Sequence, residues 1–519
     1  MKKLKKIIAV FALMALMPSV VFAQNSKKER CDSENCVFEI LQNLNSKDKN
    51  EVAEAKRILD SLANDAKYTG DSSAKDALKK SLIPFAEKFN NNENRDYLFS
   101  LLPIFCSKED AYEIFKSVEN ESVADYAIRT VGDIPGSEDI IGKYIVKNHD
   151  DLRHKAALAY AVGKLGMSDM ENELVLWING ADDKTKAEIY NALWVIKTND
   201  KTAKIVKKGA KKLYNSKVYE IKIAGMKLVV AVEGEKALPK LYKALKSDDR
   251  NVRVGALDLM KPFVNQKVCE TVVKKCKKGD ALIDAINWLG EIKNDSQMEF
   301  LIAKLSSEDK KVVAATIRAI FKIDNQNGID AVKPMFGGEY QEVIKESMVA
   351  YEGNYRAVLN DVVRGDDKQK LAVLQIIESR PDVGMFNRVR ELLYSDNQQI
   401  RDAAYNDLKY VVVVAHYQAL SALLENCDGK YVEQVQIAIK NAVKNAPAAT
   451  KDEFASTLKH VKPNIMPRFY NVFAFFGTEL CVDKLIDAYK NGDYKFEARE
   501  ALMLVENEQF AEKIREALK

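Results

Sequence analysis

The residues that most often perform acid–base and metal chemistry are scarce in this sequence. Only four of its 519 residues are histidines: His149, His154, His416 and His460. Histidine is the commonest general base near neutral pH, and zinc sites need ligands at short, fixed spacings. None of the four belongs to an HExxH motif or is followed by glutamate. We therefore predict surface or capping roles for His149 and His154, a helix-end position for His460, and no metal or cofactor.

Motifs for phosphate binding and nucleophilic catalysis are also missing. The sequence contains no GxGxxG, phosphate loop, GxSxG or CxxC. Its many Asp and Glu residues are spread among expected turns between helices. There, capping of helix starts explains them better than a glycosidase-like pair of carboxylates. No catalytic residue is assigned, and the sequence favours a protein that binds rather than one that catalyses.

The seven cysteines form an odd, sparse set rather than a disulfide framework. Cys31 and Cys36, in CDSENC, are close enough to bridge, and they are our candidate disulfide. Cys269 and Cys276 are about 10 Å apart if they share one helix, too far for a bond. The five cysteines other than Cys31 and Cys36 are predicted to be small buried hydrophobic residues.

Positive charge is concentrated between Lys197 and Asp280, which contain 22 basic and 9 acidic residues. Lysine-rich solvated helix faces are one explanation, because lysine is a good helix former that usually stays exposed. The other is an anion-binding stretch for an acidic glycan, a lipopolysaccharide core or an acidic protein. The candidate residues for that stretch are Lys207, Lys208, Lys211, Lys212, Arg250, Arg253, Lys274 and Lys275.

Aromatic residues cluster in the segment PRFYNVFAFFG. At helical spacing Phe469, Phe473 and Phe476 share one face and are expected in the core. Tyr470 and Phe475 are then candidates for an exposed aromatic contact. A second apolar segment, YVVVVAHY at 410–417, is predicted to be a buried helix rather than a membrane segment.

The first 23 residues are arranged like a signal peptide. A basic MKKLKK start precedes an apolar run, Ile7 to Val21, and a small residue, Ala23. The run is broken by Pro18 and is short of the roughly 20 residues that span a bilayer. We expect cleavage after Ala23, with an uncleaved N-terminal anchor as the alternative. The protein is then periplasmic or secreted, with no membrane span after cleavage.

Removal of the signal peptide leaves 76 basic and 76 acidic residues, so the mature chain is neutral. Neutrality removes any whole-chain electrostatic argument for binding to nucleic acid or to a membrane surface. No nucleic-acid partner is predicted.

A unit of about thirty residues recurs along the chain. It places Asp or Ser before Val or Ile, often with Arg or Lys, then Ala, then a large apolar residue. Clear copies begin at Asp150, Asp248, Ser307 and Asp396. Such a unit holds two short helices and a turn. Side chains of Ser247–Asp249 and Ser395–Asn397 are expected to cap helices.

Small residues in the repeat are expected to have two uses. Alanines such as Ala256 and Ala315 stand where neighbouring helices would have to approach closely. Gly166 and Gly290 are expected to end helices, because glycine adopts the left-handed conformation most easily.

These residues resemble HEAT repeats, in particular the short HEAT-like variety also found in phycobilisome lyases, over roughly residues 90–519. The resemblance implies an all-α solenoid of about thirteen stacked antiparallel helix pairs, HEAT/ARM-like, with a long surface for partners. The expected organisation is a signal peptide at 1–23, a flexible linker at 24–30, an N-terminal helical capping region at 31–120 and a repeat array at 121–519.

The resulting functional hypothesis is an exported, non-catalytic scaffold or adaptor that binds a protein or an acidic partner. The alternative is an accessory subunit of a secreted carbohydrate-processing system that acts with a separate catalytic chain. Neither hypothesis includes a cofactor.

Overall fold

The computed structural model describes residues 34–69, 72–88, 91–149 and 152–519, so the expected signal peptide, linker and Cys31 lie outside the described residues. Over these ranges the chain is built from helices joined by short turns, with no strand. The all-α solenoid is thus confirmed. No helix in the same ranges has both the length and the apolar character that crossing a membrane requires.

The chain divides into two compact units, Met1–Ala237 and Leu238–Lys519. We call them the first and second unit. The boundary expected at residue 120 falls inside the first unit. The α-helices of the first unit are α2 (Glu34–Gln42), α3 (Lys49–Thr69), α4 (Ser72–Lys88), α5 (Asn92–Phe105), α6 (Lys108–Lys116), α7 (Ala124–Gly132), α8 (Glu138–Lys147), α9 (Lys155–Leu165), α10 (Glu171–Trp177), α11 (Asp183–Ile196), α12 (Asp200–Tyr214) and α13 (Tyr219–Glu233).

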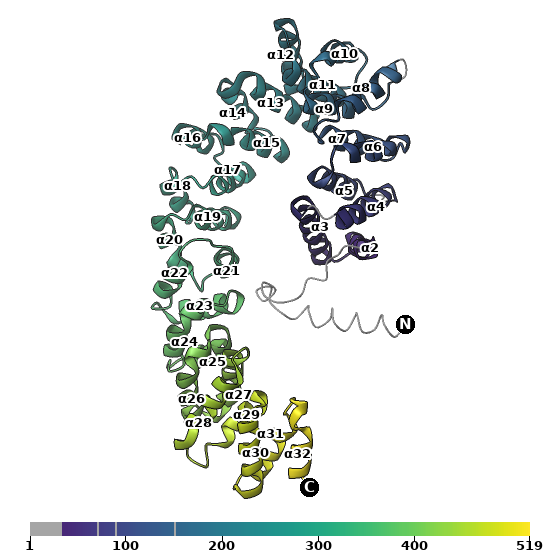
Figure 1. The fold of residues 1–519 in the computed structure, drawn as a ribbon. Coiled ribbons are helices and arrows are strands. Elements are labelled where there is room, and N and C mark those ends of the chain that lie inside the picture. Colours follow the sequence, from purple (N-terminus) through teal and green to yellow (C-terminus); the bar gives the residue numbers. More distant parts are fainter. Residues whose placement is uncertain (1–33, 70–71, 89–90, 150–151) are drawn as a thin grey trace. The chain divides into compact units, whose positions relative to one another are not determined.

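The second unit is also built from helices (Figure 1), with short 3-10 turns between many of them. Its α-helices are α14 (Leu238–Ala244), α15 (Arg250–Met260), α16 (Gln266–Lys275), α17 (Gly279–Glu291), α18 (Met298–Lys304), α19 (Lys310–Ile323), α20 (Gln326–Val332), α21 (Gln341–Val349), α22 (Tyr355–Val362), α23 (Asp367–Ser379), α24 (Phe386–Leu392), α25 (Gln398–Val411), α26 (Tyr417–Asn426), α27 (Val432–Val443), α28 (Ala448–Thr457), α29 (Pro467–Phe476), α30 (Glu479–Asn491), α31 (Lys495–Met503) and α32 (Ala511–Ala517).

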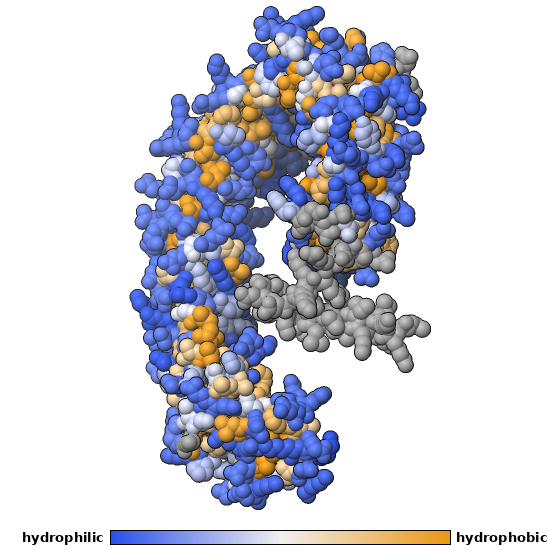
Figure 2. Space-filling view, in the orientation of Figure 1, coloured by the Kyte–Doolittle hydropathy of each residue, from blue (hydrophilic) through white to orange (hydrophobic). Residues whose placement is uncertain are grey.

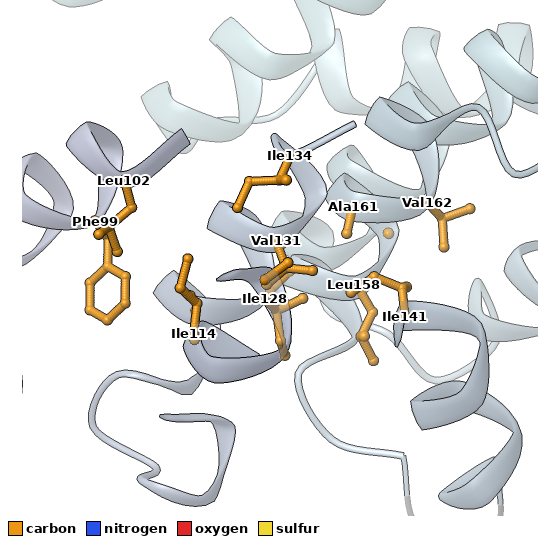
Figure 3. Close-up of a cluster of buried hydrophobic side chains, with 14 of the residues drawn as sticks. Phe99, Leu102, Ile114, Ile128, Val131, Ile134, Ile141, Leu158, Ala161 and Val162 are labelled. Atoms are coloured by element: carbon orange, nitrogen blue, oxygen red, sulfur yellow. The ribbon is translucent and has the colours of Figure 1, made fainter. Parts of the chain in front are cut away.

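Each repeat packs on the next through its second helix. In the first unit α5, α7, α9 and α11 contact one another in that order, and in the second unit α15, α17, α19 and α21 do the same. Within each unit the core therefore follows these stacked helices. Figure 3 shows part of it, where Ile128 and Val131 of α7 lie between Phe99 of α5 and Leu158 of α9.

Helix starts are capped where the sequence predicts. The Asp249 side chain accepts hydrogen bonds from the backbone N–H groups of Asn251 and Val252, and Asn397 accepts from that of Gln399. Gly166 ends α9 with a left-handed backbone, φ 67°. A side-chain oxygen at the cap satisfies a backbone donor that has no partner within the helix.

The prediction that Gly290 ends its helix in a left-handed conformation is wrong. Gly290 lies within α17, where a Cβ atom would stand 2.9 Å from Cα of Ala319 in α19. Gly163 faces Ala192 at the same 2.9 Å. Glycine is required here because adjacent repeats touch backbone to backbone, and each pair is separated by 29 residues in the sequence.

We predict that Gly163→Ala destabilises the first unit by about 1–3 kcal/mol, because the added methyl group must push α9 away from α11. The matched control is Gly142→Ala in α8, where a Cβ atom meets only Met167 at 3.5 Å. That substitution should stabilise by about 0.5–1 kcal/mol, since alanine is the better helix former. Thermal unfolding followed by circular dichroism measures both. Equal effects at the two positions would contradict the backbone contact.

Polar side chains also join neighbouring repeats. The Tyr160 hydroxyl donates to Asp133 at 2.9 Å, and Tyr351 donates to Asp324; each pair is 27 residues apart. Lys108 pairs with Asp139 at 3.0 Å in the same way. Many surface charges are therefore neutralised by the adjacent repeat.

The prediction of one buried helix over residues 410–417 is wrong. Helix α25 ends at Val411, a 3-10 turn covers Val414–His416, and Val413 and Val414 are exposed. Four consecutive valines disfavour a helix here, because β-branched side chains crowd the preceding helical turn.

Candidate interaction surface

Helix α12 carries its lysines on one face. At 100° per residue they occupy an arc of about 140°, opposite a buried stripe formed by Val206, Gly209, Ala210 and Leu213. All six are exposed: Lys201, Lys204, Lys207, Lys208, Lys211 and Lys212. The only acidic residue of the helix is Asp200, in its first turn. Figure 2 shows mainly hydrophilic residues over the part of the molecule where Figure 1 places α12.

The six lysines of α12 have no ion-pair partner among the described residues. Several lysines elsewhere pair with a carboxylate on the next repeat. Examples are Lys261 with Glu291 at 3.1 Å and Lys333 with Asp361 at 2.6 Å. The charge of α12 is therefore left for solvent or for another molecule.

A buried carboxylate fixes the start of α12. Glu171 of α10 accepts hydrogen bonds from the Thr198 backbone N–H and the Asn199 side-chain amide, each at 2.9 Å. Burial acts to raise the pKa of Glu171, but hydrogen bonds from Thr198, Thr202 and Asn199 outweigh it, so the pKa lies below its ordinary value. Asn199 in turn caps the helix by accepting from the Thr202 backbone N–H.

Glycines hold α12 against its neighbours. A Cβ atom on Gly209 would stand 2.3 Å from the Tyr190 ring of α11, and one on Gly225 of α13 would stand 2.2 Å from the Tyr214 backbone nitrogen. Both contacts require glycine, so α12 lies directly against α11 and α13. The lysine face is thus mounted on a fixed helix rather than on a loop.

The remaining predicted cationic residues lie in the second unit. Arg250 is exposed and donates to Asp284 at 3.0 Å, while Lys274 and Lys275 are exposed near the end of α16. The prediction that Arg253 binds a partner is wrong. Its side chain is only 6% exposed and pairs with Asp284 at 2.9 Å. It also donates to the Ser247 and Asp248 carbonyl oxygens, so it ties a turn together and is not available to a partner.

Of the two predicted aromatic contacts, one is wrong. Tyr470 is buried, because α29 is contacted by α27, α30 and α31 and therefore buries more than one face. Phe475 is 41% exposed. The amino groups of Lys440 and Lys451 lie 5.8 and 6.0 Å from the centre of its ring.

The histidine side chains contact different partners rather than one another. His154 Nδ1 lies 2.7 Å from Asp125, His460 pairs with Glu425, and His416 stacks on Phe386. Within the described ranges, no three His, Cys, Asp or Glu side chains are grouped as metal ligands would be. Cys36 is disulfide-bonded; its expected partner, Cys31, lies outside those ranges.

A groove of about 810 Å³ in the second unit runs past the ends of α17, α19 and α21. Its charges neutralise one another, since Lys293 pairs with Glu352 and Arg318 with Glu346. The groove therefore has no excess of one charge, unlike α12.

Sequence reasoning missed Lys201 and Lys204, which lie on the same face as the four predicted lysines of α12. Their spacing of three and four residues from one another and from Lys208 would have revealed them once the helix start at Asn199 was known.

No protein-family model matches the chain, and comparison with curated proteins finds no match. Solved structures give distant likenesses. UNC-45 from Drosophila melanogaster is 12% identical, with 94% of this chain and 85% of that chain covered and a TM-score of 0.35. A homology model of the full-length AP-3 complex in an intermediate open conformation is 12% identical (94% and 91% covered, TM-score 0.30). The karyopherin Kap121p bound to the SUMO protease Ulp1p is 11% identical (93% and 54% covered, TM-score 0.24). Likenesses at this level carry no argument about function.

Proposed function

We propose that this protein is an exported scaffold or adaptor that binds a protein partner on its helical surface and performs no reaction of its own. The observation that carries the proposal is the unpaired lysine face of α12. A fixed, uniformly charged surface of this kind attracts an oppositely charged partner and orients it on approach.

The scaffold role is tested by photo-cross-linking in cells that produce the protein. A cross-linking residue replaces Lys208 on α12 in one variant and Lys278, exposed before α17, in the control. We expect one reproducible protein to be captured from position 208 only. When irradiation is carried out at about 0.5 M salt, that protein should no longer be captured. Capture of nothing, or only of further copies of this chain, would contradict the proposal.

The exported location is tested separately. Sequencing the N-terminus of the protein purified from its own cells should find Gln24 as the first residue, as cleavage after Ala23 requires. A mature chain that still begins at Met1 would contradict cleavage at Ala23.

A further inference from the structure

Resting on the scaffold role proposed above, we propose that the lysine face of α12 docks an acidic segment of a partner protein, one that also carries apolar side chains. The six lysines extend over about 16 Å along the helix, at 1.5 Å per residue. That length matches a short helix or an extended segment of about five residues.

The residue types on α12 argue for an acidic peptide over a nucleic acid. The helix contains no arginine, and its one aromatic residue, Tyr214, is half-buried. Base recognition relies on arginine forks and on exposed aromatic rings for stacking. Lysine supplies a mobile point charge instead, which suits several carboxylates without fixed geometry.

The apolar residues of α12 argue against an anionic membrane. They are buried or half-buried, so the helix has no apolar face left to enter a lipid surface. Along α12 itself a membrane would therefore meet charge alone.

Exposed apolar residues stand beside the two ends of the helix. Val195 precedes the capping residue Asn199 by four positions and is 65% exposed; Val218 follows Tyr214 by four positions and is 55% exposed. Charge flanked by apolar positions suits a protein segment whose acidic stretch has apolar residues beside it. A purely anionic polymer would leave both valines unused.

The test uses a fluorescein-labelled peptide of about 16 residues, made of Asp, Glu and Leu, and the full-length protein. Binding is followed by fluorescence anisotropy at about 50 and 300 mM NaCl. The test variant is K204E/K208E/K211E. The control, K275E/K277E/K278E, makes the same charge change at three exposed lysines of the second unit.

We expect the α12 variant to bind at least about tenfold more weakly and the control to stay within about twofold of the unaltered protein. Val218→Ser, which keeps every lysine, should weaken binding about threefold. The peptide should also bind more weakly at the higher salt concentration.

Three results would overturn this inference: no binding of the peptide, equal losses in both triple variants, or α12-dependent binding of phosphatidylglycerol vesicles without binding of the peptide. Each leaves the scaffold role to be judged by cross-linking. A partner captured at position 208 that still binds the K204E/K208E/K211E variant would preserve the scaffold and reject the acidic segment.

Discussion

Replacing Asp284 by alanine is expected to destabilise the second unit by about 3–5 kcal/mol. Its side chain is 2% exposed and bonds Arg253 of the preceding repeat, whose own side chain is 6% exposed. Loss of the carboxylate leaves a guanidinium buried without its counter-charge. The effect should be local to α15 and α17, because each repeat contacts only its neighbours.

Hydrogen exchange measured by mass spectrometry resolves that local loss of protection. Arg250→Ala is the control: it removes a second ion pair from the same carboxylate, but the Arg250 side chain is 70% exposed, so the loss should stay below about 1 kcal/mol. The double variant R253M/D284L should recover at least half of the stability, since no buried charge remains. Equal losses of stability for Asp284→Ala and Arg250→Ala would show that burial of the Arg253–Asp284 pair does not increase its contribution to stability.

Asp284 stabilises the second unit, whereas the Asp407 carboxyl group should lower the stability of that unit at neutral pH. Burial in α25, with a smaller contribution from Glu378, raises the pKa of Asp407 from 3.8 to about 7. The folded state therefore favours the protonated acid. The stability that this preference provides is fully present below about pH 3.8 and is lost as pH rises through about 7. A rise of about three in the pKa corresponds to about 4 kcal/mol in the free energy of unfolding.

We predict that Asp407→Asn is about 2–4 kcal/mol more stable than the unaltered protein at pH 8 and nearly equal to it at pH 4. Urea unfolding across that pH range, followed by hydrogen exchange in α25, gives the difference. Asp396→Asn, at an exposed carboxylate in the turn before α25, should change stability little at any pH. A benefit of Asp407→Asn that is the same at pH 4 and pH 8 would rule out ionisation as its cause.

Local features of the fold could be predicted from the sequence. The caps at Asp249 and Asn397 depend only on the residues that follow within one turn. The helix-pair repeat was visible for the same reason, since its hydrophobic spacing is set by α-helical geometry.

Features that depend on the neighbouring repeat could not be predicted. Arg253 looks like any exposed arginine until Asp284, 31 residues later, is placed beside it. Gly290 looks like a helix end until Ala319 is seen against it. In both cases the partner is one repeat away, and the sequence does not specify which faces meet.

The candidate site was predicted in part for a related reason. Helical spacing places Lys207, Lys208, Lys211 and Lys212 on one face. Arg253 was included in the candidate site only because it lies in the same basic stretch, and it is buried. Composition counts charges without showing which are already paired. The removal of Arg253 from the candidate set required its buried ion pair with Asp284 in the folded chain.

The lysine face has an energetic consequence for α12 itself. Lys204 and Lys208, and Lys207 and Lys211, are like charges at i and i+4, and each such pair disfavours the helix by a few tenths of a kcal/mol. An anion that binds there relieves this repulsion. The free protein therefore keeps a helix that is less stable than its packing would allow, and salt, which weakens ordinary ion pairs, should strengthen this helix instead.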